Sequence, residues 1–331
     1  MAKPKAAFYW AAGCGGCEEA IVDLDADLLD VVEAVEIVFW PAAFDFKRSD
    51  VEAMDDAEIA VCFINGAVRT GDQKEMVKLL RQKSGLVVAF GACACLGGIP
   101  GLANFWDRES ILNRAYREVP SVVNPEGILP GIRTVSTEGK LVLPEFFNEV
   151  LTLDQVIAVD YFLPGCAPPA DLILQALKAI LEGTLPEKGS VLAPDKQLCD
   201  TCPRRDSKPE KILIKEFKRV HELKTDTEKC FLVDGIICMG SATRSGCGER
   251  CIKANMPCLG CFGPTAPVLD QGAKFLSALA SIMDAKDEDE ARRIADTIAD
   301  PAGMFYMYSM PASLLRRCRE EEIYDKKQDY N

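Results

Sequence analysis

The sequence predicts an α/β protein whose second part is irregular and rich in cysteine. Short apolar runs alternate with amphipathic stretches through the first half, and most of the cysteines crowd together in the second half. Strands that alternate with helices are typical of a parallel sheet covered by helices on both faces. At 331 residues the chain is long enough for about two domains, so we expect one domain of each kind.

The first predicted domain, residues 1–188, is a flavodoxin-like, doubly wound parallel sheet. Runs rich in β-branched residues predict strands at 5–12, 35–41, 57–65, 85–91 and 155–163. Apolar residues at helical spacing predict helices near 18–33, 72–83, 108–118 and 169–183. The uncharged stretch 84–106 contains a proline and five glycines. It is therefore interpreted as a buried strand running into a loop, not as a membrane helix.

The second predicted domain, residues 189–331, begins in a segment rich in prolines and charges between residues 184 and 212. Eight of the fifteen cysteines lie in residues 199–261, where long apolar runs are few. We expect the order of this region to come largely from bound metal and not from a hydrophobic core. Helical patterns return at 266–284 and 288–299, ahead of a charged tail.

Composition excludes several classes of function. The net charge of −13 argues against a nucleic-acid or anionic-membrane partner, because both need a basic face. A hydrophobic content of 48% excludes disorder. The apolar run at the N-terminus is too short for a signal peptide, so a cytoplasmic location is expected. Disulfides are then a poor explanation for the thiols, and metal binding is the better one.

Three cysteine motifs in the first domain each follow a predicted strand. They are C-G-G-C at Cys14 and Cys17, G-A-C-A-C at Cys93, and L-P-G-C at Cys166. Loops that leave the carboxyl ends of parallel strands converge on one crevice, so these four thiols are expected to meet there. Glycines beside them allow the backbone to wrap closely around a cluster.

The second region supplies eight further thiols, enough for two more sites with four cysteines each. Zinc would make these sites structural, whereas iron–sulfur clusters would make them redox-active. Iron–sulfur is favoured because the first-domain site lies in a crevice where α/β proteins keep function. Two alternatives stay open: a zinc-stabilised interaction scaffold, and a free-standing dithiol oxidoreductase that uses Cys14 and Cys17.

In combination, these motifs resemble the small, electron-transferring subunit of nickel–iron hydrogenases, from Cys14 to about Pro264. The segments C-G-G-C-E-E-A-I-V-D-L and S-G-C-G-E-R-C look most like the cytosolic methyl-viologen-reducing type associated with heterodisulfide reductase in methanogens. The small subunit of a sulfhydrogenase or an NAD(P)-linked cytosolic hydrogenase is the alternative within the family.

The resemblance implies three [4Fe–4S] clusters, with a [3Fe–4S] cluster as the alternative at the medial site. It also implies that the nickel–iron centre belongs to a large partner subunit and not to this chain, and that a heterodisulfide reductase complex accepts the electrons. The implied ligands are Cys14, Cys17, Cys93 and Cys166 for the proximal cluster, Cys199, Cys202, Cys230 and Cys238 for the distal cluster, and Cys247, Cys251, Cys258 and Cys261 for the medial cluster.

A few other residues have two interpretations each. Glu18 follows a proximal ligand and either relays protons, as the resemblance implies, or only complements the helix dipole. Arg204 and Arg205 either dock an acidic redox partner or form an ordinary solvated face. The remaining thiols and the single histidine are expected to be core or surface side chains and not ligands; they are Cys62, Cys95, Cys318 and His221.

Overall fold

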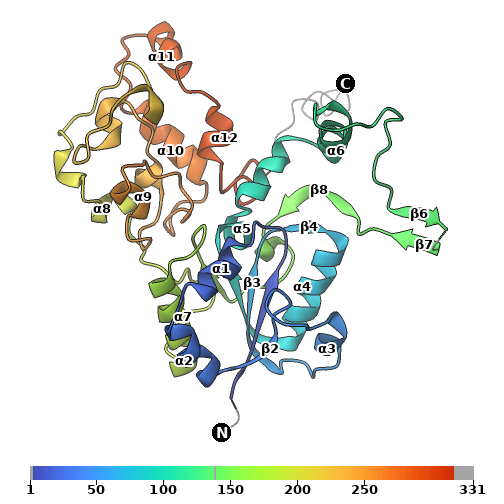
Figure 1. The fold of residues 1–331 in the computed structure, drawn as a ribbon. Helices are drawn as coiled ribbons and strands as arrows, with labels where there is room; N and C mark the ends of the chain where they lie inside the picture. The colour runs from blue at the N-terminus through green and yellow to red at the C-terminus, as the bar shows by residue number, and fades with distance from the viewer. Residues whose placement is uncertain (1–2, 138, 317–331) are drawn as a thin grey trace, which may run out of the picture.

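The computed structural model describes residues 3–137 and 139–316 of the chain. Its centre is a parallel sheet of five strands in the order β2-β1-β3-β5-β9 (Figure 1). The predicted α/β fold class is confirmed. The strands of this sheet are β1 (Lys5–Trp10), β2 (Glu36–Phe39), β3 (Ile59–Asn65), β5 (Ser84–Phe90) and β9 (Tyr161–Leu163).

Side chains alternate between the two faces of the sheet, and each face has its own core. Phe63 of β3 packs with Phe8 and with the helices α1 (Gly16–Val22), α2 (Asp27–Ala34) and α7 (Ala170–Glu182). Ile64, the next residue, packs on the opposite face with α3 (Arg48–Glu52) and α4 (Gly71–Lys83). Helices therefore cover both faces, as a doubly wound sheet requires.

Several predicted elements are shorter or more broken than expected. The helix predicted at 18–33 is two helices, α1 and α2, because the backbone turns at Asp25, whose φ is +53°. The strand predicted at 155–163 is only β9, which follows a 3₁₀ turn, η3 (Leu153–Gln155). The helix predicted at 108–118 is α6 (Arg108–Asn113) followed by a π-helical turn, η2 (Arg114–Glu118).

The stretch 84–106 is a buried strand at its start, as predicted, but the rest is not a loop. After β5 the chain forms α5 (Ala92–Leu96) and a 3₁₀ helix, η1 (Ile99–Phe105). Four short strands were not predicted. They are β4 (Val68–Thr70), which precedes α4, and β6 (Arg133–Ser136), β7 (Gly139–Val142) and β8 (Phe146–Leu151), which follow η2. β4 pairs with β8, and β6 with β7 as a hairpin that projects from the body (Figure 1).

The second region has a hydrophobic core of its own, contrary to expectation. Apolar side chains from Leu198 to Met310 form one cluster, in which Phe275 and Phe305 are fully buried and in edge-to-face contact. The predicted helix 266–284 is α10 (Gln271–Ala280), because Asp270 caps it by accepting from Ala273 N–H at 2.9 Å. The other elements are α8 (Leu198–Thr201), η4 (Arg205–Ser207), η5 (Val220–Glu222), η6 (Phe231–Asp234), η7 (Met239–Ala242), α9 (Arg250–Lys253), α11 (Glu288–Ala295) and α12 (Pro301–Phe305).

The division between the domains at residues 188 and 189 stays a proposal. Two backbone hydrogen bonds continue past it, since Phe162 N–H donates to Ser190 O at 3.1 Å and Leu192 N–H donates to Phe162 O at 2.8 Å. The segment just after the division is therefore still attached to the edge strand β9.

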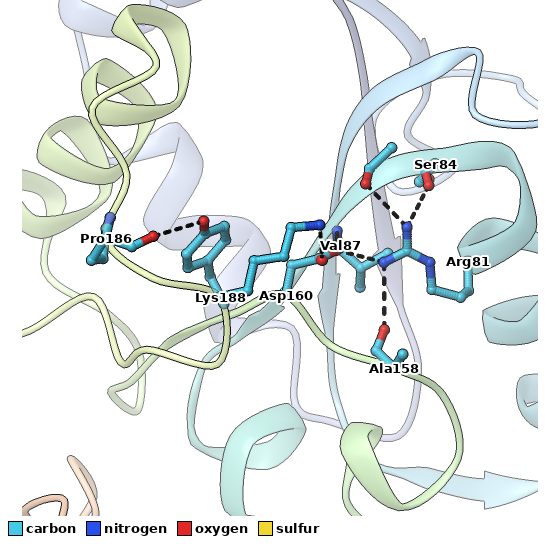
Figure 2. Close-up of polar contacts among 9 residues, drawn as sticks. Arg81, Ser84, Val87, Ala158, Asp160, Pro186 and Lys188 are labelled. Carbon is cyan, nitrogen blue, oxygen red and sulfur yellow. Dashed lines mark hydrogen bonds and ion pairs between the residues drawn. The ribbon is translucent and has the colours of Figure 1, made fainter.

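Asp160, which directly precedes the edge strand β9, is a buried carboxylate that bonds to several neighbouring segments (Figure 2). Asp160 receives Val87 N–H at 2.8 Å and forms ion pairs with Arg81 at 2.5 Å and Lys188 at 2.7 Å. Burial alone would raise the pKa of Asp160, but the hydrogen bonds from Lys188, Val87 and Arg81 outweigh it and lower the pKa. Asp160 thus joins β5, α4 and the segment that leads into the second region.

We expect Asp160→Asn to lower the free energy of unfolding by about 3 kcal/mol at pH 7, because two cations lose their shared anion. A carboxyl whose pKa is lowered on folding contributes stability above its unfolded pKa of about 4, and loses it as the pH falls through the folded pKa. Urea unfolding from pH 7 to pH 3 measures this, with the exposed Asp56→Asn as control. A difference between Asp160→Asn and wild type that stays constant at low pH would contradict the assignment.

Candidate metal centres

The four thiols of the first domain lie within electrostatic reach of one another at the carboxyl ends of the strands. Cys17 is close enough to Cys93, Cys166 and Cys14 for their charges to repel one another. Burial, reinforced by this repulsion, raises the pKa of Cys17 well above its usual range and that of Cys93 to about 12. Four thiolates cannot share this place without positive charge, which an iron–sulfur core provides when it binds and releases the protons.

The backbone around these thiols is shaped as a cradle. Gly91 has a φ of +86°, and a Cβ there would lie 2.3 Å from Cys17 Sγ. Gly98 has a φ of +56°, and a Cβ there would lie 2.4 Å from Cys93 Sγ. Only glycine permits both the positive φ and the close approach of the backbone to sulfur. The surroundings therefore fit a bulky group bound to all four thiols.

The second set of thiols lines one cavity. Cys199, Cys202, Cys230 and Cys238 line it, together with Leu198, Arg204, Phe231, Leu232, Gly240 and Ile252. Cys199 interacts electrostatically with Cys230 and Cys202, and Cys238 with Cys199 and Cys230. Burial raises the pKa of Cys199, and that of Cys238 to about 12. The four residues assigned to the distal cluster are thus brought together.

The third set lies between the other two. Cys261 interacts with Cys247 and Cys251, and Cys258 interacts with Cys261. Burial raises the pKa of Cys247, that of Cys261 to about 12, and that of Cys258 well above its usual range. Cys251 is exposed, and it still lies within electrostatic reach of its set.

Backbone hydrogen bonds to sulfur connect the third set of thiols to the first set and to the second set. Cys166 N–H donates to Cys261 Sγ, and Cys258 N–H donates to Cys238 Sγ at 3.3 Å. Among the described residues, no three His, Cys, Asp or Glu side chains are grouped tightly enough to hold one metal ion. The fit of a larger cluster rests instead on the glycine cradle and on the charge balance of the thiols.

Three thiols were predicted to be non-ligands. Cys62 of β3 is fully buried in the core, and burial raises its pKa to about 12. Cys95 is buried, and its Sγ–H donates to the backbone oxygen of Ala89 at 3.3 Å. Cys318 lies outside the described residues. His221 is exposed.

Arg204 and Arg205, which were treated as one pair from the sequence, differ in their exposure to solvent. Arg205 is exposed, in keeping with a surface role. Arg204 is 3% exposed and lines the distal cavity, so both interpretations made for it were wrong. Nothing in its sequence context, C-P-R-R, separates the two residues, because their burial depends on segments 20 to 50 residues away.

Glu18 is buried, with 7% of its surface exposed. Its Oε2 accepts the indole N–H of Trp40, and its Oε1 accepts Asn65 Nδ2–H at 2.5 Å. Trp40 and Asn65 were not singled out from the sequence, because only the sheet brings them next to α1. The carboxylate is therefore held inside the protein and is not a simple exposed cap.

Comparisons with known proteins agree with this arrangement. The family model described as NADH ubiquinone oxidoreductase, 20 Kd subunit, matches residues 14–180. The iron–sulfur subunit of the F420-non-reducing hydrogenase of Archaeoglobus profundus is 41% identical over 318 residues, covering 95% of this chain and 98% of that protein. The chain belongs to the family of these hydrogenase iron–sulfur subunits.

Other members of the family are similar over the same length. The corresponding F420-non-reducing hydrogenase subunit of Methanothermobacter thermautotrophicus is 35% identical, with 95% of this chain and 96% of that protein covered. A solved [NiFeSe] hydrogenase from Desulfovibrio vulgaris Hildenborough has a chain with a TM-score of 0.50 at 18% identity, covering 81% of this chain and 95% of that one. That likeness shows a shared fold. Membership in the family makes the chain part of an oxidoreductase and implies iron–sulfur clusters.

Proposed function

We propose that this hydrogenase subunit carries electrons away from a nickel–iron centre on a partner chain, through three [4Fe–4S] clusters, to a docked acceptor. The observation that carries the proposal is the serial arrangement of the thiols. The middle set is hydrogen-bonded to one neighbouring set through Cys166 N–H and to the other through Cys258 N–H. A zinc scaffold has no need for such a line of sites, whereas electron transfer requires it.

The ligands proposed for each cluster are those implied by the sequence. Bound clusters would supply one-electron carriers whose potentials respond to burial and to hydrogen bonds on sulfur. The chain itself fixes the separations and excludes water: Cys238 and Cys258 are buried, and the second hydrophobic core surrounds the distal set. A fourth thiol, Cys251, is available at the middle set, which favours four irons there over three.

The proposed partner at the proximal end is a hydrogenase large subunit. Cys14 and Cys166 are exposed in this chain, so another chain is needed to shield a proximal cluster from water. Apolar side chains also lie exposed on the segment that includes the β6–β7 hairpin, among them Val123, Val135 and Val142.

At the distal end we propose an acceptor of the heterodisulfide reductase type, and we place the complex in the cytoplasm. The described chain has no helix with the length and apolar character of a membrane span.

The direct test is anaerobic purification of the complex, followed by visible spectroscopy under hydrogen. We expect a brown protein whose broad absorption bleaches as hydrogen reduces its clusters, and a nickel-containing partner that co-purifies with this chain. A colourless complex, or activity of this chain alone without metal, would refute the proposal. Those two results would favour the zinc scaffold and the dithiol oxidoreductase, respectively.

We further propose that Glu18 relays protons at the partner interface. Its burial beside the ligand Cys17 supports this. Glu18→Gln keeps the shape but cannot exchange a proton, so hydrogen uptake is expected to fall about 100-fold. Exchange between deuterium gas and water protons, which needs no electron transfer along the clusters, is expected to fall equally.

The matched control is Glu19→Gln, since Glu19 is the exposed neighbour on the same helix. The spectrum of the clusters reports whether Glu18→Gln has damaged the site. Unchanged hydrogen uptake in Glu18→Gln would remove the relay and leave Glu18 with a structural role, holding Trp40 and Asn65 against α1.

A further inference from the structure

Arg204 is a buried cation for which the described residues supply no carboxylate partner. Its guanidinium is held by carbonyl and amide oxygens: Nη1 donates to Asp226 O and Lys229 O, each at 3.0 Å, and Nη2 donates to Ile252 O at 3.4 Å and Asn255 Oδ1 at 2.7 Å. Its Cζ lies 4.1 Å from the centre of the Phe231 ring. All of these partners are neutral, and none of the ion pairs of the described chain includes Arg204.

A second buried arginine in the same region shows the usual solution. Arg244 is also 3% exposed, and it forms an ion pair with Asp195 at 2.9 Å. A buried charge is costly unless an opposite charge lies nearby. Arg204 therefore lacks the carboxylate partner that Arg244 has.

One nitrogen of Arg204 also lacks a hydrogen-bond acceptor. Nε is buried and donates to no atom of the described chain, while the two Nη atoms are engaged with oxygens. The side chain lines the same cavity as Cys199, Cys202, Cys230 and Cys238. Buried N–H groups in folded proteins are nearly always bonded, so this one indicates an acceptor in the cavity.

We propose that Arg204 Nε–H donates to the iron–sulfur cluster bound by these four cysteines, and that its charge raises the reduction potential of that cluster. The inference rests on the proposed function, since it requires a cluster at the distal site. A cluster held by four thiolates carries net negative charge, which is the partner that Arg204 lacks. Reduction adds a further electron, and a fixed cation stabilises the reduced form more than the oxidised one.

Raising the distal potential makes the last site the place where electrons collect before they leave the subunit. Arg204 thus sets a potential by direct contact with the cluster. Lys208 lies within electrostatic reach of Cys199, but Lys208 is partly exposed, so water screens its charge more strongly than that of the buried Arg204. Arg205 is adjacent in sequence, yet it is exposed and donates to Asp200 O at 3.1 Å.

The first test uses the wild-type complex labelled with nitrogen-15 at arginine Nε. Pulsed electron paramagnetic resonance on the reduced distal cluster is expected to detect a nitrogen coupling to the cluster. The coupling should persist in Arg205→Gln and disappear in Arg204→Lys, which keeps the charge and removes Nε. Wild-type clusters that show no such coupling would overturn the hydrogen bond, whereas a wild-type complex without clusters would instead overturn the proposed function.

The second test is a redox titration of each cluster in the same complex. In Arg204→Gln the distal reduction equilibrium is expected to shift about tenfold towards the oxidised form, which is about 59 mV for a one-electron couple. The proximal potential should not move, and Arg204→Lys should shift the distal one less than Arg204→Gln. A distal potential equal to wild type in Arg204→Gln, or an equal shift in Arg205→Gln, would overturn the electrostatic role. Should Arg204→Gln fail to bind the cluster, the comparison of Arg204→Lys with Arg205→Lys decides, because only the buried position is expected to respond.

Discussion

Replacing Cys93 by alanine is expected to remove the proximal cluster, and with it about four of the irons bound by the chain. Cys93 interacts with Cys166 and Cys14, so three thiols remain and cannot complete four-sulfur ligation. Changes outside the ligand shell of metal sites typically cost 10–100-fold, so loss of a ligand should reduce hydrogen-dependent viologen reduction by at least about 100-fold. Iron analysis and viologen reduction by the purified complex measure the two effects.

Cys95 is the matched control, because it lies two residues away in the same G-A-C-A-C motif. Its Sγ–H donates to Ala89 O inside the core. Cys95→Ala should keep the full iron content and lose about 1–2 kcal/mol of stability through the lost hydrogen bond and packing. Equal iron loss in both variants would mean that the motif is structural and that Cys93 is not a ligand.

The Gly91→Ala variant is expected to be nearly as damaging as Cys93→Ala, although it removes no sulfur. The new Cβ would lie 2.3 Å from Cys17 Sγ, so either the ligand or the backbone must move. The positive φ of +86° adds backbone strain of about 1–2 kcal/mol. We expect loss of the proximal irons and a fall in viologen reduction of at least about 100-fold, as for the loss of a ligand.

The Gly189→Ala variant separates strain from the contact with sulfur. Gly189 has a similar φ of +90°, and a Cβ there meets nothing within 4 Å. It should cost a similar amount of stability and leave the iron content unchanged. If Gly91→Ala also keeps its iron and activity, the glycine is needed for the turn after β5 and not as part of a cradle.

Much of the sheet and the convergence of the proximal thiols could be predicted because their signals are local, whereas the division of the other eight thiols into two sets came from the family resemblance. Alternating apolar runs predict β1, β3 and β5, and each proximal motif directly follows such a run. The rule that loops converge at the carboxyl ends of parallel strands then brings Cys14, Cys93 and Cys166 together.

The features that were missed depend on contacts between distant segments. The burial of Arg204 is made by carbonyls near residues 226–229 and 252–255, and no pattern around C-P-R-R encodes them. The hydrophobic core of the second region is built from single apolar residues and short apolar runs spread over more than 100 positions, so no long apolar run signals it. Breaks such as the one at Asp25 arise because tertiary packing overrides a continuous helical pattern.

The most direct test of the account is the content of iron, acid-labile sulfide and zinc in this chain after anaerobic purification of its complex. Three [4Fe–4S] clusters predict about twelve irons and about twelve sulfides per chain, without stoichiometric zinc. Zinc in place of iron, with no acid-labile sulfide, would contradict the account and leave the twelve cysteines as ligands of structural ions.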